Sequence, residues 1–216
     1  MKKLLLVLLI LLVLVIGGVL FADMKVRGLA EEHAEDRITS TLTQAEGVHV
    51  TFDGFPFVLG VLATGQVEAL HVKIDRVREQ GLEAQDLSLD VETISIDTDA
   101  LIDEQRLVVT DIGAARVQGF IADEQVSKVV GQEVHCTPGA IKAKVEGVEV
   151  QATATVKGRT VVLAAPIPGV EPLVFPLPPT DVLPCAPQLE VLEGKFRVSC
   201  TVDEIPPRLR AAMAQQ

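Results

Sequence analysis

Most of the chain after residue 47 alternates apolar and polar residues with a period of two. The clearest run begins with Leu87-Ser-Leu-Asp-Val91, continues to Asp97, and slips by one residue near Thr93. Because neighbouring side chains of a strand point to opposite faces, the alternation predicts antiparallel sheet with one covered face. The slip predicts a β-bulge. Strands are expected at residues 48–52, 67–78, 87–97, 107–112, 116–121, 141–145, 148–156 and 160–164.

Two segments show helical patterns instead. Between Lys25 and Ala45 apolar residues recur every four positions, which predicts an amphipathic helix that ends before Gly47. Its stripe is expected to pack on the domain or to continue as a stalk from the segment before it. Residues 123–130 predict a short helix capped by Asp123. Residues 166–187, which hold eight of the 12 prolines, predict a rim or crossover, and residues 206–214 predict a short final helix.

The N-terminus carries a long apolar run behind Lys2 and Lys3. Residues Leu4–Ala22 are apolar apart from two glycines, and as a helix they would span about 28 Å, close to the thickness of the bilayer core. We expect residues 1–24 to form an uncleaved signal anchor with one transmembrane helix, and residues 25–216 to form one β-rich domain. A signal peptide cleaved after Ala22 and a buried core helix are the alternatives.

The charge balance excludes several partners. The chain has 19 basic and 30 acidic residues, so its net charge is −11. This sign argues against nucleic acid as a partner and against electrostatic adhesion to anionic lipids. A hydrophobic content of 48% excludes an acidic disordered tail.

Three cysteines fit an oxidising compartment with one bridged pair and one remaining thiol. Cys185 and Cys200 flank an expected hairpin and form the favoured pair. The rival pairing, Cys136 with Cys185, follows from a weak repeat in which each of these cysteines stands before a proline and a Glu-Gly turn. The spacing of cysteine and histidine matches no zinc site, so no metal is expected.

Motifs that carry catalysis are missing from the sequence. It contains no G-x-S-x-G, H-E-x-x-H, Walker or G-x-G-x-x-G motif. His71 near Asp75 is the one acid/base pair that would support a hydrolase, and a surface pair is the simpler interpretation. We expect no enzyme, no catalytic residue and no cofactor.

Three phenylalanines gather around Pro56, which prevents a regular central strand. This segment predicts either a core corner or a hydrophobic mouth that contacts acyl chains. Lys73, Arg76 and Arg78 are either head-group ligands or solvated charges. The expected lipid-binding residues are Phe52, Phe55, Phe57, Leu59, Leu70, Val72 and Ile74.

Several short motifs are similar to those of one protein family. They are Leu29-Ala-Glu, Ala34-Glu-Asp-Arg37, Gly54-Phe-Pro-Phe57 with Gly65 after it, residues 72–77, Leu183-Pro-Cys-Ala-Pro187 and residues 198–204. Over roughly residues 25–205 the chain resembles the LmeA family of actinobacterial cell-envelope phospholipid-binding proteins. The resemblance implies an elongated, barrel-like antiparallel sheet around an apolar lipid cavity, outside the cytoplasmic membrane, as in tubular lipid-binding domains. It implies no catalytic residues.

A lipid carrier needs such an interior, because exposing two acyl chains of about 30 methylenes to water costs about 24 kcal/mol. We therefore expect a mainly-β α+β fold, with an elongated curved antiparallel sheet or barrel around a cavity and an N-terminal amphipathic helix packed on it. The expected function is extracytoplasmic phospholipid binding from a single-pass anchor in the cytoplasmic membrane, in support of envelope lipid trafficking or biogenesis. The alternative is a non-enzymatic envelope scaffold that binds a protein partner through an acidic sheet face.

Overall fold

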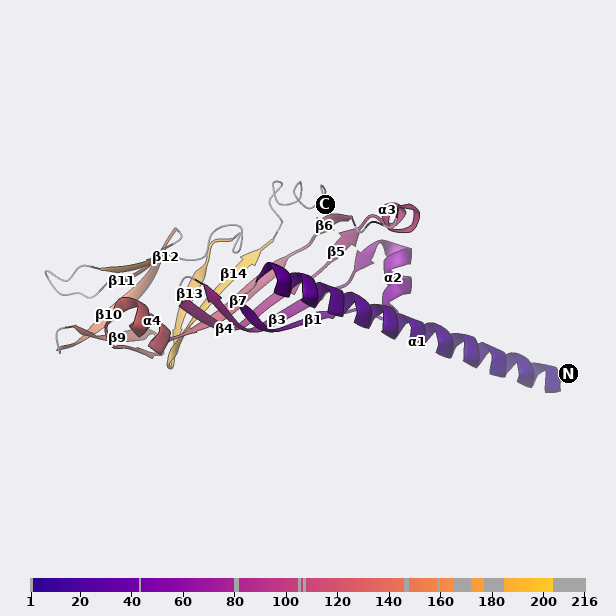
Figure 1. The fold of residues 1–216 in the computed structure, drawn as a ribbon, viewed down its shortest axis with the longest axis horizontal. Coiled ribbons are helices and arrows are strands. Elements are labelled where there is room, and N and C mark those ends of the chain that lie inside the picture. The colour runs from indigo at the N-terminus through magenta and orange to yellow at the C-terminus, as the bar shows by residue number, and fades with distance from the viewer. Residues whose placement is uncertain are drawn as a thin grey trace.

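A six-stranded antiparallel sheet forms the middle of the elongated molecule (Figure 1). The computed structural model describes residues 2–42, 44–79, 82–104, 106, 108–145, 148–158, 160–164, 172–176 and 185–203. The order across this sheet is β1 (Ala45–Phe52), β3 (Leu70–Glu79), β4 (Leu82–Val91), β7 (Ala115–Ala122), β14 (Lys195–Val202) and β13 (Gln188–Leu192).

Two smaller antiparallel sheets lie beside it. A five-stranded sheet has the order β12 (Leu173–Pro176), β11 (Thr160–Ala164), β10 (Val148–Lys157), β9 (Ala140–Val145) and β8 (Val134–Thr137). A three-stranded sheet has the order β2 (Gln66–Val67), β5 (Ile94–Ile96) and β6 (Val109–Ile112). The helices are α1 (Lys2–Thr41), α2 (Phe57–Thr64), α3 (Thr98–Asp103) and α4 (Asp123–Val130).

Strand register places apolar residues on one face of the six-stranded sheet, here called the inner face. Val50 lies opposite Val72, Val72 opposite Leu89, Leu89 opposite Val117, and Val117 opposite Cys200. The period-two alternation of each strand therefore continues across the sheet. This agrees with the expected one-sided sheet.

Helix α1 covers the free edge of β1. Glu35 accepts a hydrogen bond from the backbone N–H of Val50 at 2.8 Å, and Glu31 accepts one from Phe52 at 3.0 Å. Four helical residues rise about 6 Å and two strand residues about 6.7 Å, so the two carboxylates match alternate edge N–H groups. The helix thereby closes an edge that would otherwise be open to pairing with another chain.

The apolar stripe of α1 packs on the inner face. Ala34, Ile38 and Leu42 contact a buried cluster of Val50, Val72 and Ile74. The helix is continuous over 40 residues, so it joins the N-terminal run to the amphipathic segment without a break (Figure 1). Side chains of α1 are described from Gly17 onward, so most of the Leu4–Ala22 run lies outside them. Within the described part of the chain, no helix is long and apolar enough to span a membrane.

A second core lies at the other end of the molecule. It is formed by α4, the five-stranded sheet and the adjoining ends of β13 and β14; its buried members are Val126, Val134, Cys136, Ile141, Ala152, Val161, Leu163 and Phe196. The N–H of Gly194 donates to the carbonyl of Cys136 at 3.0 Å, and that of Gly139 donates to Val191 at 3.1 Å. These bonds attach the β13–β14 turn to the five-stranded sheet.

The architecture is mainly β with helices, as expected, but the barrel was not found. Among the described strands, β1 and β13 do not pair, so the six-stranded sheet is open. The two hairpins of the weak repeat belong to different sheets, which removes the reason for pairing Cys136 with Cys185.

The predicted bulge near Thr93 is wrong. There β4 ends at Val91 and β5 starts at Ile94 in another sheet, so the slip marks a connection between strands whose faces are set independently. The β4 bulge lies between Gln85 and Ser88, where the register to β7 shifts.

Two expected helix signals have other roles. Helix α1 ends at Thr41, before Gly47 as expected, but Gly47 itself lies within β1 at a φ of 67°, where a Cβ would overlap the Asp75 carboxylate. The helix at 123–130 is present, but Asp123 does not cap it, because its carboxylate accepts the N–H of Cys136 at 3.0 Å instead. Of the remaining expectations, most of residues 166–187 and all of residues 206–214 lie outside the described residues.

Candidate functional site

Coverage of the inner face changes along the molecule. Val50, Val72 and Ile74 are buried beneath α1, and Phe196 is buried at the other end. Between them, five residues of β4, β7 and β14 are half-buried, although Val91 and Cys200 on the same strands are buried and two of the five pack against the cluster beneath α1. We call these five residues the central patch: Leu87, Leu89, Val117, Gly119 and Val198.

The central patch is continuous. Leu89 lies opposite Val117, and Gly119 opposite Val198. A Cβ on Gly119 would stand 3.1 Å from Cγ of Leu87, so the glycine leaves room for the Leu87 side chain on this face. The patch is therefore a smooth aliphatic surface that can contact hydrocarbon.

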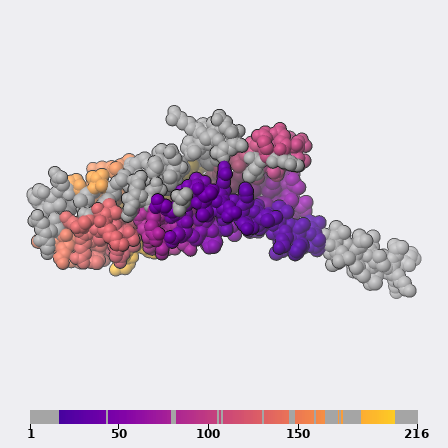
Figure 2. All heavy atoms as spheres, viewed as in Figure 1, coloured from indigo at the N-terminus to yellow at the C-terminus, as the bar shows by residue number. Residues whose placement is uncertain are grey.

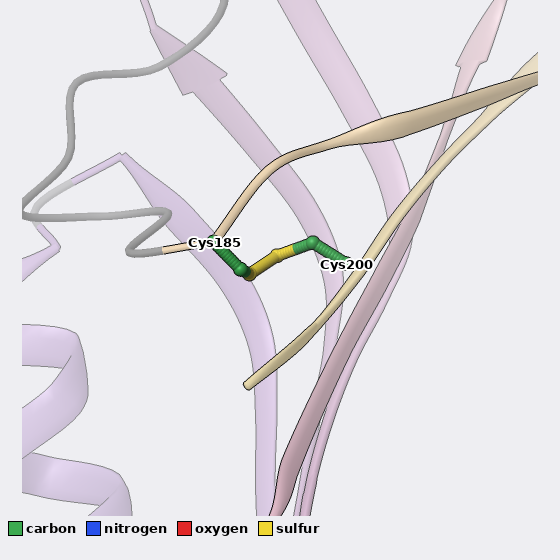
Figure 3. The surroundings of a disulfide bond; sticks show 2 residues. All are labelled: Cys185 and Cys200. Carbon is green, nitrogen blue, oxygen red and sulfur yellow. A yellow bond between two sulfur atoms is a disulfide. The ribbon is translucent and has the colours of Figure 1, made fainter. Parts of the chain in front are cut away.

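Cys185 and Cys200 form a disulfide beside the patch, and this is the pair that the sequence favours. The bond joins the chain just before β13 to the inner face of β14 (Figure 3), with the Cα atoms 5.7 Å apart. Cys136 is a buried free thiol whose pKa is raised to about 12, mainly by burial and then by the Asp123 charge. A buried thiol that stays protonated is a poor nucleophile.

The predicted lipid-binding residues fall into two groups. Phe52, Leu70, Val72 and Ile74 lie on or against the inner face in the cluster beneath α1, and the ring of Phe57 packs on Phe52 with centroids 5.5 Å apart. Phe55 and Leu59 instead belong to the α2 segment and are 67% and 51% exposed. The structure thus joins the first group through Phe57 to an exposed second group.

An acidic residue of α1 holds α2 in place. Pro56, at the N-cap of α2, provides no side-chain acceptor. The Asp23 carboxylate, buried in the protein, accepts hydrogen bonds from the N–H groups of Phe57 at 2.9 Å and Val58 at 2.6 Å. Sequence reasoning missed this role, although a single aspartate directly after a long apolar run was the available signal.

The proposed head-group cations already have partners. Arg76 and Arg78 each lie within 3.2 Å of both Glu46 and Glu83. The hydrogen bond from Arg78 holds the pKa of Glu83 below its ordinary value. Two arginines and two glutamates make a locally neutral cluster, and Lys73 lies exposed on the outer face. A phosphate would have to displace these carboxylates from the arginines.

His71 does not pair with Asp75. Its Nδ1 lies 2.7 Å from Asp90 and its Nε2 3.2 Å from Asp53. Residues four apart on one strand are separated by about 13 Å, which puts Asp75 out of reach. These hydrogen bonds raise the pKa of His71, with Asp90 the larger cause. No group of three or more side chains suited to a metal occurs among the described residues.

Residues 22–215 match the model of a family described as LmeA-like phospholipid-binding. The chain belongs to this family. Searches among curated proteins and among solved structures found no match. The LmeA-like match agrees with the family indicated by the sequence motifs, and it covers the six-stranded sheet, the disulfide and α2 together.

Proposed function

We propose that this LmeA-like protein binds a phospholipid with its acyl chains against the central patch, which forms one wall of an apolar site. The observation that carries the proposal is the half-buried state of this patch between two buried cores. An acyl chain gains most free energy by contacting apolar protein surface that is still partly exposed to water. The family description as phospholipid-binding supports the same assignment.

The proposal includes an anchor and a location. The Leu4–Ala22 run supports membrane attachment by residues 1–24, and the Cys185–Cys200 disulfide supports an oxidising compartment for residues 25–216. The domain then lies outside the cytoplasmic membrane and takes part, without catalysis, in envelope lipid trafficking or biogenesis.

The scaffold alternative required an acidic sheet face. The sheet instead carries cations among its carboxylates, and some are paired: Arg76 and Arg78 with Glu46 and Glu83, and Arg197 with Glu190. This mixed surface gives no particular support to a protein partner.

Photo-crosslinking tests the lipid site. The full chain is placed in nanodiscs containing a phosphatidylcholine with a diazirine in one acyl chain, irradiated, and analysed by peptide mass spectrometry. We expect adducts in β4, β7 and β14 in addition to the N-terminal helix. Val117→Glu should remove the strand adducts, because a carboxylate on the patch cannot be desolvated cheaply.

Gln118→Glu is the matched control. Residue 118 neighbours Val117 but points to the outer face, so this variant should keep the strand adducts. Adducts confined to the N-terminal helix in the unsubstituted chain would contradict the proposal.

A further inference from the structure

Helix α2 is apolar yet incompletely buried. Residues 55–64 contain no charged residue, and Thr64 is their only side chain with a hydrogen-bonding group. Val61 is buried, whereas Phe55, Leu59 and Leu62 are 67%, 51% and 46% exposed. Leu59 and Leu62, three positions apart, share one stripe of α2, and Phe55 lies just before the helix. A helix that is hydrophobic all round is normally buried, so this stripe lacks a cover among the described residues.

Other exposed apolar side chains occur at the same end of the molecule. Phe21 and Met24 of α1 are 65% and 68% exposed, and Ile102 of α3 is 59% exposed. These elements adjoin the end of the sheet from which the N-terminal half of α1 departs (Figures 1 and 2). We call the following set the apolar end: Phe21, Met24, Phe55, Leu59, Leu62 and Ile102.

The apolar end is held together by specific bonds. Asp23 ties the start of α2 to α1 through the N–H groups of Phe57 and Val58. At the other end of α2, the carbonyl of Gly65 accepts the N–H of Ile96 at 2.7 Å, just before α3. The three helices therefore present their exposed apolar residues from a fixed frame.

We propose that the apolar end is inserted in the interface of the lipid bilayer. Asp23 directly follows the Leu4–Ala22 run, so the hydrogen bond that its carboxylate accepts from α2 sets this helix beside the end of the proposed membrane segment. The chain's net charge of −11 gives it no electrostatic attraction to anionic lipid, so apolar insertion is the contact that its surface allows. The inference rests on the proposed anchor and adds the orientation of the domain.

This orientation provides a path for acyl chains. Phe57 of α2 contacts Phe52, which packs against the cluster on the inner face. Apolar side-chain contacts thus connect α2 with the cluster on the inner face, and α2 places no charged side chain along this connection.

Tryptophan fluorescence tests the insertion. The chain has no Trp and no Tyr, so Leu59→Trp introduces a single emitter into the full-length protein. The variant is reconstituted in phosphatidylcholine vesicles with and without bromine on the acyl chains. We expect its emission to shift to shorter wavelength and to be quenched by the brominated lipid.

Val148→Trp is the control, because Val148 is 62% exposed and lies on β10 in the five-stranded sheet at the opposite end. Its emission should be the same in both lipids.

Vesicle flotation separates the two possible failures. A protein that floats with vesicles while its Leu59→Trp emission ignores bromine overturns the insertion and leaves the anchor intact. A blue shift without quenching, as a protein partner or a second copy would produce, also overturns it. Protein that does not float contradicts the anchor itself.

Discussion

At the scale of single residues, carboxylates from neighbouring strands pair with the cations of β3. Arg76 and Arg78 share Glu46 and Glu83, and His71 lies between Asp53 and Asp90. All three partnerships join residues that the strand register brings together. These polar pairs are suited to contact with water, whereas the inner face provides the apolar contacts.

Removing His71 should change how stability depends on pH. Because Asp90 and Asp53 raise the pKa of His71, the folded protein favours the protonated ring. This contribution is complete below the ordinary value of 6.5 and is lost as the pH rises through the raised pKa. The Tm advantage of the unsubstituted chain over His71→Gln should therefore be larger at about pH 5.5 than at about pH 8.

His33→Gln is the comparison variant, since His33 is exposed on α1. Its Tm should follow that of the unsubstituted chain at both pH values. A Tm difference for His71→Gln that is constant or grows with pH would show that the imidazole is not protonated preferentially in the folded state.

At the scale of elements, three carboxylates attach α1 to the rest of the protein. Asp23 binds the start of α2, while Glu31 and Glu35 bind the edge of β1. The first N–H groups of a helix lack intrahelical partners, and alternate N–H groups of an edge strand also point outward. One helix thus satisfies exposed donors of two different elements.

Asp23→Ala should release α2 selectively. Loss of the cap should lower the free energy of unfolding by about 1 kcal/mol, and hydrogen exchange should accelerate at the amides of Phe57 and Val58. Exchange at Phe52 should not change in this variant. Glu31→Ala should give the reverse pattern, with faster exchange at Phe52 and no change at Val58. Equal exchange at Phe57 and Val58 with and without Asp23 would contradict the capping role.

At the scale of the whole molecule, two buried cores flank a half-buried central patch. One core lies under α1 and the other at the five-stranded sheet, and the Cys185–Cys200 disulfide lies next to the patch. The bond closes a loop with a sequence separation of 15. It therefore restrains the β13–β14 hairpin. The face on which it does so is not completely covered by other apolar residues in the described part of the chain.

Thiol counting tests this arrangement. The native chain without reductant should react slowly with a maleimide, because Cys136 is buried and its pKa is about 12. Unfolding in denaturant should expose one thiol per chain, and prior reduction should expose three. Replacing Cys185 and Cys200 together by serine should lower the free energy of unfolding by about 3 kcal/mol. Three reactive thiols in the unreduced, unfolded chain would contradict the disulfide.

Local patterns predicted most of the strands, although residues 67–78 and 87–97 each contain parts of two strands, and they did not predict α2. Residues such as Val72 and Ile74 alternate with polar neighbours, and backbone geometry alone assigns such residues to one face. Helix α2 has no polar stripe, and its cap is Asp23, which is 34 residues before Phe57. Nothing within residues 57–64 shows where that helix begins.

The sequence by itself determined the family, the apolar face of each strand and the amphipathic stripe of α1, because these depend on motifs or on spacing between near neighbours. Only the tertiary structure decided that the main sheet is open, that Arg76 and Arg78 are paired with glutamates, and that the central patch is half-buried between two cores. Those features depend on which strands pair and on what covers them. Pairing brings together residues such as Val117 and Cys200, which are far apart in the chain, and no local pattern carries that information.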